Sequence, residues 1–135
     1  MLKVVGTMFI ENNKLLICKP RNKKTYQMIG GKVEQFETPL EAAIRESHEE
    51  LGGEIILDKN KFEFVMDFLE FATSDPSEKI HFYVFKYNGK LKGFLKTSLE
   101  IEKFMWYNSD FGTIILSNTL KNEVVPYCLK KKLIR

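Results

Sequence analysis

Apolar and aromatic residues recur in short stretches separated by polar turns along much of the chain. Such residues fill 3–10 and 14–18, on either side of the polar residues 11–13, and this pattern predicts a hairpin. Residues 61–72 and 78–87 have the same character and predict a second hairpin. The first two-thirds of the chain is therefore expected to be rich in β-strands.

Shorter elements are expected between and after these hairpins. Residues 26–29 read as a short strand that Gly30-Gly31 ends, and residues 104–107 as another strand. The chain from Ser109 onward is expected to be helical in two pieces. Pro126 then falls in or near the first turn of the last helix, because proline inside a helix costs about 3 kcal/mol.

The clearest helix signal begins at Thr38. This residue is a good N-cap, Pro39 suits the first helical position, and Glu41 completes a capping box. Gly52-Gly53 is expected to end the helix. One face carries residues at spacings of three and four that are expected to be buried, namely Leu40, Ala43, Ser47 and Leu51.

The order of these elements indicates a fold class. Strands, one helix, strands and then helices, without regular βαβ alternation, predict an α/β or α+β fold in which helices pack on a mixed sheet. With 135 residues, 44% of them apolar and 29% charged, the chain fits one globular domain spanning residues 1–135. We expect a cytoplasmic protein with Cys18 and Cys128 reduced, since no membrane span or signal peptide is evident.

A cluster of carboxylates on the expected helix carries the candidate chemistry. Glu46 neighbours both Glu49 and Glu50 on a helix, so three like charges share one edge near its negative end. Arg45 lies four residues before Glu49 and can orient carboxylates on that edge. A solvated acidic face is the plain alternative, whereas a hard cation such as Mg²⁺ would reverse the repulsion.

The full spacing distinguishes between these alternatives. The stretch from Gly31 to Gly53 resembles the signature of the Nudix hydrolases, in the form found in the MutT-like branch, with Gly31, Glu37, Arg45, Glu46, Glu49, Glu50 and Gly52 in place. The resemblance implies an α/β/α sandwich. It also implies an enzyme that uses Mg²⁺ or Mn²⁺ and water to cleave a nucleoside diphosphate linked to another group.

The same resemblance implies roles for individual residues. Glu46, Glu49 and Glu50 would be metal ligands together with the carbonyl of Gly30. Arg45 and Glu37 would orient them. A further glutamate is expected ahead of a Trp-bearing strand; with Trp106 as that tryptophan, Glu100 is the candidate metal ligand or general base and Glu102 the alternative. A plain surface position is equally open for Glu100.

Three further residues are candidates for binding the substrate. Arg21 lies where MutT-like enzymes place an arginine on substrate phosphate, with a solvated loop charge as its alternative, and Lys32 follows the glycine pair. Asn122 lies where that branch has an Asn that reads the purine edge; helix capping is its alternative role. Departures from the family pattern, among them Ile29 and Phe36, bear on the shape of the pocket more than on the metal ligands.

These residues predict a Mg²⁺-dependent pyrophosphohydrolase. The expected substrate is a nucleoside triphosphate, with oxidised purine forms included, cleaved to the monophosphate and pyrophosphate. ADP-ribose, nucleotide sugars, dinucleoside polyphosphates and a non-catalytic nucleotide sensor are the alternatives. The net charge of +3 is too small to predict a nucleic-acid partner, and a homodimer stays open.

Overall fold

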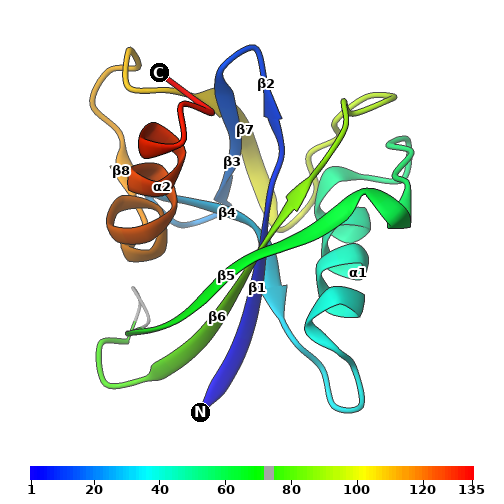
Figure 1. Cartoon of the computed structure of the whole chain (residues 1–135), viewed down its shortest axis with the longest axis vertical. Helices are drawn as coiled ribbons and strands as arrows, with labels where there is room; N and C mark the ends of the chain where they lie inside the picture. Colours follow the sequence, from blue (N-terminus) through cyan, green and yellow to red (C-terminus); the bar gives the residue numbers. More distant parts are fainter. Residues whose placement is uncertain (72–74) are drawn as a thin grey trace.

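The computed structural model describes residues 1–71 and 75–135, so residues 73 and 74 of the second expected turn lie outside the described residues. Figure 1 shows the order of its elements. These are β1 (Leu2–Met8), β2 (Ile10–Glu11), β3 (Lys14–Pro20), β4 (Thr25–Lys32), α1 (Pro39–Leu51), the 3₁₀ turn η1 (Lys59–Lys61), β5 (Phe62–Phe71), β6 (Lys79–Tyr87), β7 (Ile101–Tyr107), β8 (Ile115–Leu116), the π-helical turn η2 (Leu120–Val124) and α2 (Val125–Lys130).

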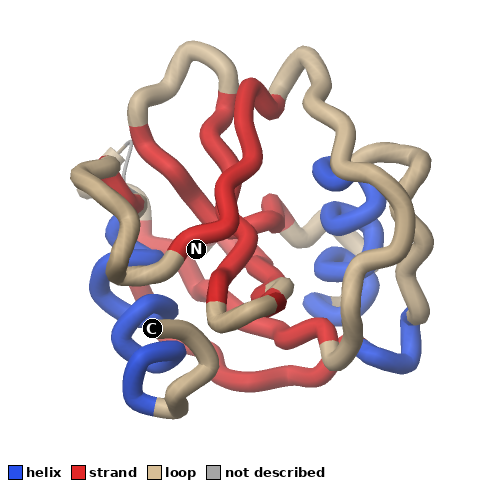
Figure 2. The backbone as a smooth tube through the Cα atoms, turned by 90° about the horizontal axis from the view of Figure 1, so that it is seen from above, coloured by secondary structure: helices blue, strands red, loops and turns tan. Residues whose placement is uncertain are grey.

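The strands form a mixed sheet in the order β2-β3-β4-β1-β6-β5, with β7 paired to β3 and β8 paired to β4. The β1–β6 and β4–β8 pairs are parallel and the other named pairs are antiparallel. Helix α1 lies on one side of the strands, and η2 and α2 lie on the other (Figures 1 and 2). The predicted mixed sheet with helices packed on it is confirmed, as is the α/β/α arrangement.

The core has two apolar layers because neighbouring strand residues point to opposite faces of the sheet. On β3, Leu16 packs in the layer under α1, whereas Leu15 packs in the layer under α2. Both side chains are fully buried. The expected buried cysteines follow the same rule: Cys18 lies in the first layer and Cys128 in the second, and both are free thiols.

Helix α1 begins as the sequence predicts. The Thr38 hydroxyl accepts a hydrogen bond from the Glu41 backbone N–H at 3.1 Å, and the Glu41 carboxylate accepts one from the Thr38 N–H at 2.9 Å. Ala43, Ser47 and Leu51 are buried as expected. The prediction for Leu40 is wrong: it is 41% exposed, since burial along α1 begins only at Ala42, one turn into the helix.

The first predicted hairpin is smaller than expected. Only the two-residue β2 pairs with β3, through Ile10 and Leu15, around a turn in which Asn12 and Asn13 have positive φ. The preceding strand β1 pairs instead with β4 and β6. Both edges of β1 are occupied by β4 and β6, so β1 cannot also pair with β3. The second hairpin, β5 with β6, is confirmed.

Strand β4 continues through Gly30-Gly31, contrary to the expectation that the glycines end it. Gly30 pairs with Gly6 and Gly31 with Val5 on β1. A Cβ atom on Gly30 would lie 1.9 Å from the Val5 carbonyl oxygen, so only glycine permits this approach. Here glycine serves close packing between strands rather than a turn.

The C-terminal region is helical only in its second half. Residues 109–117 hold the short β8 and irregular chain, because Ile115 and Leu116 pair with the start of β4 and so are drawn into the sheet. Pro126 lies in the first turn of α2, as predicted. No helix in residues 1–71 and 75–135 has the length and apolarity that crossing a bilayer requires.

Replacing the N-cap threonine tests the start of α1. Thr38→Ala is expected to lower the free energy of unfolding by about 1 kcal/mol, because the Glu41 N–H loses its acceptor. Thr113→Ala, at an exposed position in the chain before β8, is the matched control and should leave stability unchanged. Urea denaturation of both variants measures the difference; equal midpoints would contradict the capping role.

Candidate active site

Three segments meet at the site: the end of β4, helix α1, and the turn at residues 98–100 that precedes β7. The Gly30 backbone N–H donates a hydrogen bond to Glu50 Oε1 at 2.5 Å. The Glu46 carboxylate lies against Gly31, where a Cβ atom would be 2.5 Å from its carboxyl carbon. The two glycines therefore let two carboxylates of α1 approach the sheet edge closely.

The guanidinium of Arg45 links most of the charged groups at this site. It forms a bidentate pair with Glu37, with Nε and Nη2 donating at 2.7 and 2.8 Å. Its Nη1 donates to Glu46 at 2.9 Å and to Glu49 at 3.2 Å. Its Nη2 also donates to the Lys32 carbonyl at 3.0 Å. The arginine thus ties α1 both to the loop before it and to the end of β4.

The carboxylates differ in their electrostatics. Hydrogen bonding to Arg45 lowers the pKa of Glu37 to about 2, so this residue stays ionised. Burial raises the pKa of Glu50 to about 8, against the opposing hydrogen bond from Gly30 and with the like charges of neighbouring glutamates adding to it. Burial also raises the pKa of Glu46, with Arg45 opposing it. Glu50 is therefore mostly protonated at neutral pH when no cation is bound.

The two candidate glutamates near β7 lie in different surroundings. The charge of Glu100 contributes to the raised pKa of both Glu46 and Glu50, so its carboxylate lies within electrostatic range of the cluster on α1. Glu102 instead forms an ion pair with Lys19 at 2.8 Å. The structure therefore brings Glu100, rather than Glu102, together with the glutamates of the signature.

The donor set suits a hard divalent cation. The site gathers the carboxyl groups of Glu46, Glu49, Glu50 and Glu100. The charges of the other three are near enough to raise the pKa of the buried Glu50. Oxygen donors with uncompensated negative charge are the ligands that Mg²⁺ and Mn²⁺ prefer. Within residues 1–71 and 75–135, no three His, Cys, Asp or Glu side chains already stand in ready-made ligand geometry. Arg45 occupies oxygens of Glu46 and Glu49 instead.

A cavity of about 500 Å³ opens beside this cluster. It begins at Gly30, Gly31 and Lys32, and it extends along the face of the sheet that bears α2. Its wall combines cations, apolar groups and a few hydroxyl and amide groups, among them Lys23, Lys24, Gln27, Met28, Ile80, Phe82, Ser117 and Thr119. Its size falls in the range of small-molecule sites.

Of the three residues predicted to bind substrate, one lines the cavity and two do not. Lys32 lines the cavity. Asn122 is exposed on η2 and is not among the residues that line it. The guanidinium of Arg21 donates to the carbonyls of Ser98 and Leu99, at 3.0 and 3.2 Å, instead of pointing into the cavity.

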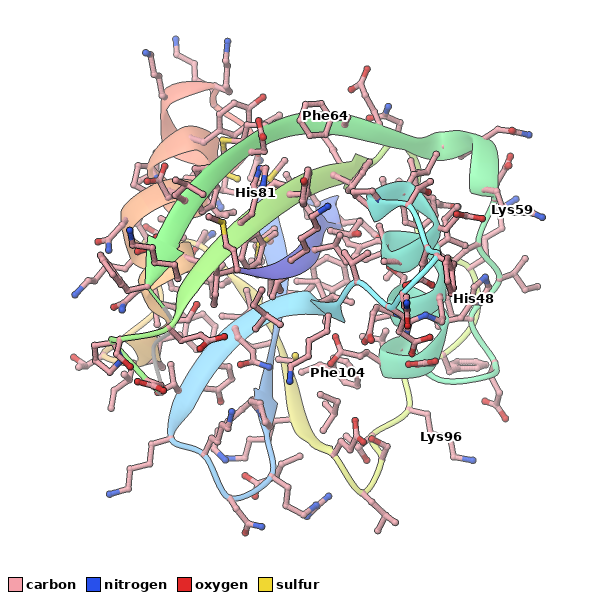
Figure 3. The ribbon with its side chains drawn as sticks, turned by 90° about the horizontal axis from the view of Figure 1, so that it is seen from below. His48, Lys59, Phe64, His81, Lys96 and Phe104 are labelled. Atoms are coloured by element: carbon pink, nitrogen blue, oxygen red, sulfur yellow. The ribbon has the colours of Figure 1, made fainter. Side chains whose placement is uncertain are left out.

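Sequence reasoning missed several residues of the cavity wall. Gln27 is a polar residue in an otherwise apolar strand, which is a usable signal. The sequence gives no signal for Ser117 and Thr119, because the region that contains them is predicted to be helical rather than part of the sheet. The two histidines are unrelated to the cluster: His81 pairs with Asp67 at 2.7 Å on the β5–β6 hairpin, and His48 is exposed on α1 (Figure 3).

Comparison with known proteins identifies the family. The NUDIX domain profile matches residues 2–110. The chain therefore belongs to the Nudix family, and the protein is a pyrophosphohydrolase of the kind that acts on nucleotide-type substrates. A search of curated protein sequences finds no match.

Solved structures share the fold at low sequence identity. A MutT NUDIX hydrolase from Burkholderia pseudomallei matches with a TM-score of 0.73 and 19% identity, over 96% of this chain and 95% of that chain. The E. coli ORF135 protein matches with a TM-score of 0.71 and 22% identity, over 98% and 92%. A UDP-X diphosphatase matches with a TM-score of 0.73 and 19% identity, over 97% of this chain and 63% of that one.

Removing the buried charge of α1 tests the electrostatics of the cluster. Glu50→Gln is expected to raise the free energy of unfolding in EDTA at alkaline pH, since the amide oxygen still accepts from the Gly30 N–H while the buried charge is gone. The folded-state pKa of about 8 lies above the ordinary value of 4.5. Wild-type stability therefore falls as pH rises through that window, and the difference between the two proteins widens.

Urea denaturation on both sides of that window measures this effect. Glu63→Gln, which replaces an exposed glutamate on β5, is the matched control and should follow the wild type. A difference between wild type and Glu50→Gln that stays constant with pH would contradict the raised pKa.

Proposed function

We propose that this protein is a Mg²⁺- or Mn²⁺-dependent hydrolase of nucleoside triphosphates, oxidised purine forms included, which yields the nucleoside monophosphate and pyrophosphate. The observation that supports it is the position of the cavity, which starts at the glycines that hold the carboxylate cluster. A substrate in this cavity would present its phosphates to the cluster. Ser117 and Thr119 belong to the same wall, which supports one functional unit over residues 1–135.

The proposed metal ligands are Glu46, Glu49, Glu50, Glu100 and the Gly30 carbonyl. Divalent cations bound there would neutralise phosphate charge and activate water. Arg45 and Glu37 keep the ligand carboxylates in place through their hydrogen bonds. A carboxylate of the cluster accepts the proton of the attacking water as the phosphoanhydride bond breaks.

The cavity wall supports a nucleotide as the bound group. Lys32 supplies positive charge for phosphate oxygens at the end of the cavity next to the cluster, and Lys23 and Lys24 add positive charge elsewhere on its wall. Farther along, the apolar wall with Met28 and Phe82 suits a base. The ring of Phe82 is held in place by a parallel stack on Phe68, with centroids 5.6 Å apart.

Replacing one exposed ligand tests the metal assignment. Glu49→Gln is expected to lower kcat by about two orders of magnitude or more, because the amide is a weaker ligand and carries no charge. Its thermal unfolding should match the wild type, since the Glu49 side chain is 57% exposed. Glu54→Gln, an exposed glutamate just beyond α1, is the control and should keep wild-type activity. Wild-type turnover by Glu49→Gln would contradict the assignment.

A product analysis tests the substrate class. The protein is incubated with Mg²⁺ and, separately, with canonical and 8-oxo nucleoside triphosphates, ADP-ribose, nucleotide sugars and diadenosine polyphosphates. We expect EDTA-sensitive release of monophosphate and pyrophosphate to be fastest with a triphosphate. Faster cleavage of another substrate would replace the triphosphate assignment, and no cleavage alongside ligand-induced thermal shifts would favour a nucleotide sensor.

A further inference from the structure

Glu100 reaches the carboxylate cluster from a turn rather than from a helix or strand. The turn is closed by the Ser98 N–H, which donates to the Ile101 carbonyl at 3.1 Å. The Ser98 hydroxyl accepts from the N–H groups of Glu100 and Ile101, at 3.2 and 3.1 Å. These bonds define the shape of the turn, but they do not fix its position relative to α1.

Arg21 supplies a bond to each of three consecutive carbonyls of this turn. Its Nη2 donates to the Ser98 carbonyl at 3.0 Å and its Nε to the Leu99 carbonyl at 3.2 Å. Its backbone N–H donates to the Glu100 carbonyl at 2.7 Å. Arg21 directly follows β3, which pairs with β7, so these bonds extend the β3–β7 ladder onto the turn.

The other anchors of this segment lie upstream of the turn. The Lys96 N–H donates to the Leu51 carbonyl at the end of α1, at 3.1 Å, and Ile56 forms an isolated bridge with Lys92. Figure 3 labels Lys96, which lies on the segment between β6 and β7, and Phe104, which lies on β7. Between Lys96 and β7, the turn is held across the chain by Arg21.

Electrostatics creates a need for this tether. The negative charges of Glu46 and Glu100 repel each other, and Glu100 sits on an exposed turn that can relax away from α1 more easily than a helix residue can. A guanidinium bound to carbonyl groups resists this displacement, and it also brings a positive charge to the base of the turn.

We propose that Arg21 is a positioning residue that holds the Ser98–Glu100 turn, so that the Glu100 carboxylate stays beside the glutamates of α1, and that it does not bind substrate phosphate. The role in catalysis rests on the proposed function. Contact with substrate phosphate, the alternative role for Arg21, is assigned instead to the lysines that line the cavity, Lys23 among them.

Steady-state kinetics separates the two roles. Arg21→Ala is expected to lower kcat about 10-fold with little change in KM, because Glu100 is displaced while the cavity is intact. Lys23→Ala should instead raise KM. Arg21→Lys should recover only part of kcat, since one ammonium cannot reproduce the fork on two carbonyls. Lys130→Ala, at the end of α2, is the charge control with wild-type kinetics.

A double-mutant cycle with Glu100→Gln tests whether Arg21 acts through Glu100. In the Glu100→Gln background, Arg21→Ala should have little further effect on kcat. Multiplying effects, or a rise in KM with kcat unchanged in Arg21→Ala, would overturn the proposal.

Hydrogen exchange supplies a readout that is independent of activity. Arg21→Ala is expected to speed amide exchange at residues 98–101 while α1 and the melting temperature are unchanged. Unchanged exchange there in an active protein would overturn the positioning role and leave the proposed function standing. Faster exchange in a protein that cleaves no substrate would support the tether and contradict the proposed function.

Discussion

The site depends on the guanidinium of Arg45. Three carboxyl groups share one edge of a 13-residue helix, close to its negative end, where every one of them that ionises repels its neighbours and opposes the helix dipole. Arg45 offsets this by pairing with Glu46 and Glu49 on its own helix and with Glu37 ahead of it. Because the same group binds the Lys32 carbonyl, it also fixes the distance between the end of β4 and α1. The orientation of Glu37, Glu46 and Glu49 therefore follows from this one residue.

The close contact of β4 with β1 is the matching constraint from the sheet. Gly30 lies so near the Val5 carbonyl that no side chain fits, and this closeness leaves the Gly30 N–H facing α1, where it binds Glu50. The resulting hydrogen bond holds a carboxyl group in place, and burial raises the pKa of that group to about 8. A buried carboxyl of this kind costs stability when it ionises, so the stability of the fold alone does not account for a glutamate at this position.

Elements that depend on residues close together in the sequence could be predicted, whereas contacts between distant segments could not. The capping box of α1 and the second hairpin are local, and the sequence pattern predicted both. The partners of β1, the continuation of β4 through Gly30-Gly31 and the pairing of β8 depend on contacts between distant segments, which no local pattern encodes. The same holds in the site: the spacing of the glutamates on α1 indicated their shared edge, whereas the contact of Arg21 with Ser98–Glu100 joins residues more than seventy positions apart.

The site thus combines two parts of different rigidity. The glutamates of α1 are fixed by a hydrogen-bonded helix whose small residues pack on the sheet, while Glu100 depends on hydrogen bonds at an exposed turn. Exposed hydrogen bonds open at lower free energy than buried ones. Phe36 shows a related local cost: it adopts a φ of 66° with its side chain 98% exposed, a conformation that glycine takes more readily. Sequence changes at the turn or at Phe36 can therefore reshape the site without unfolding α1, so the shape of the cavity can vary while the glutamates of α1 stay in place.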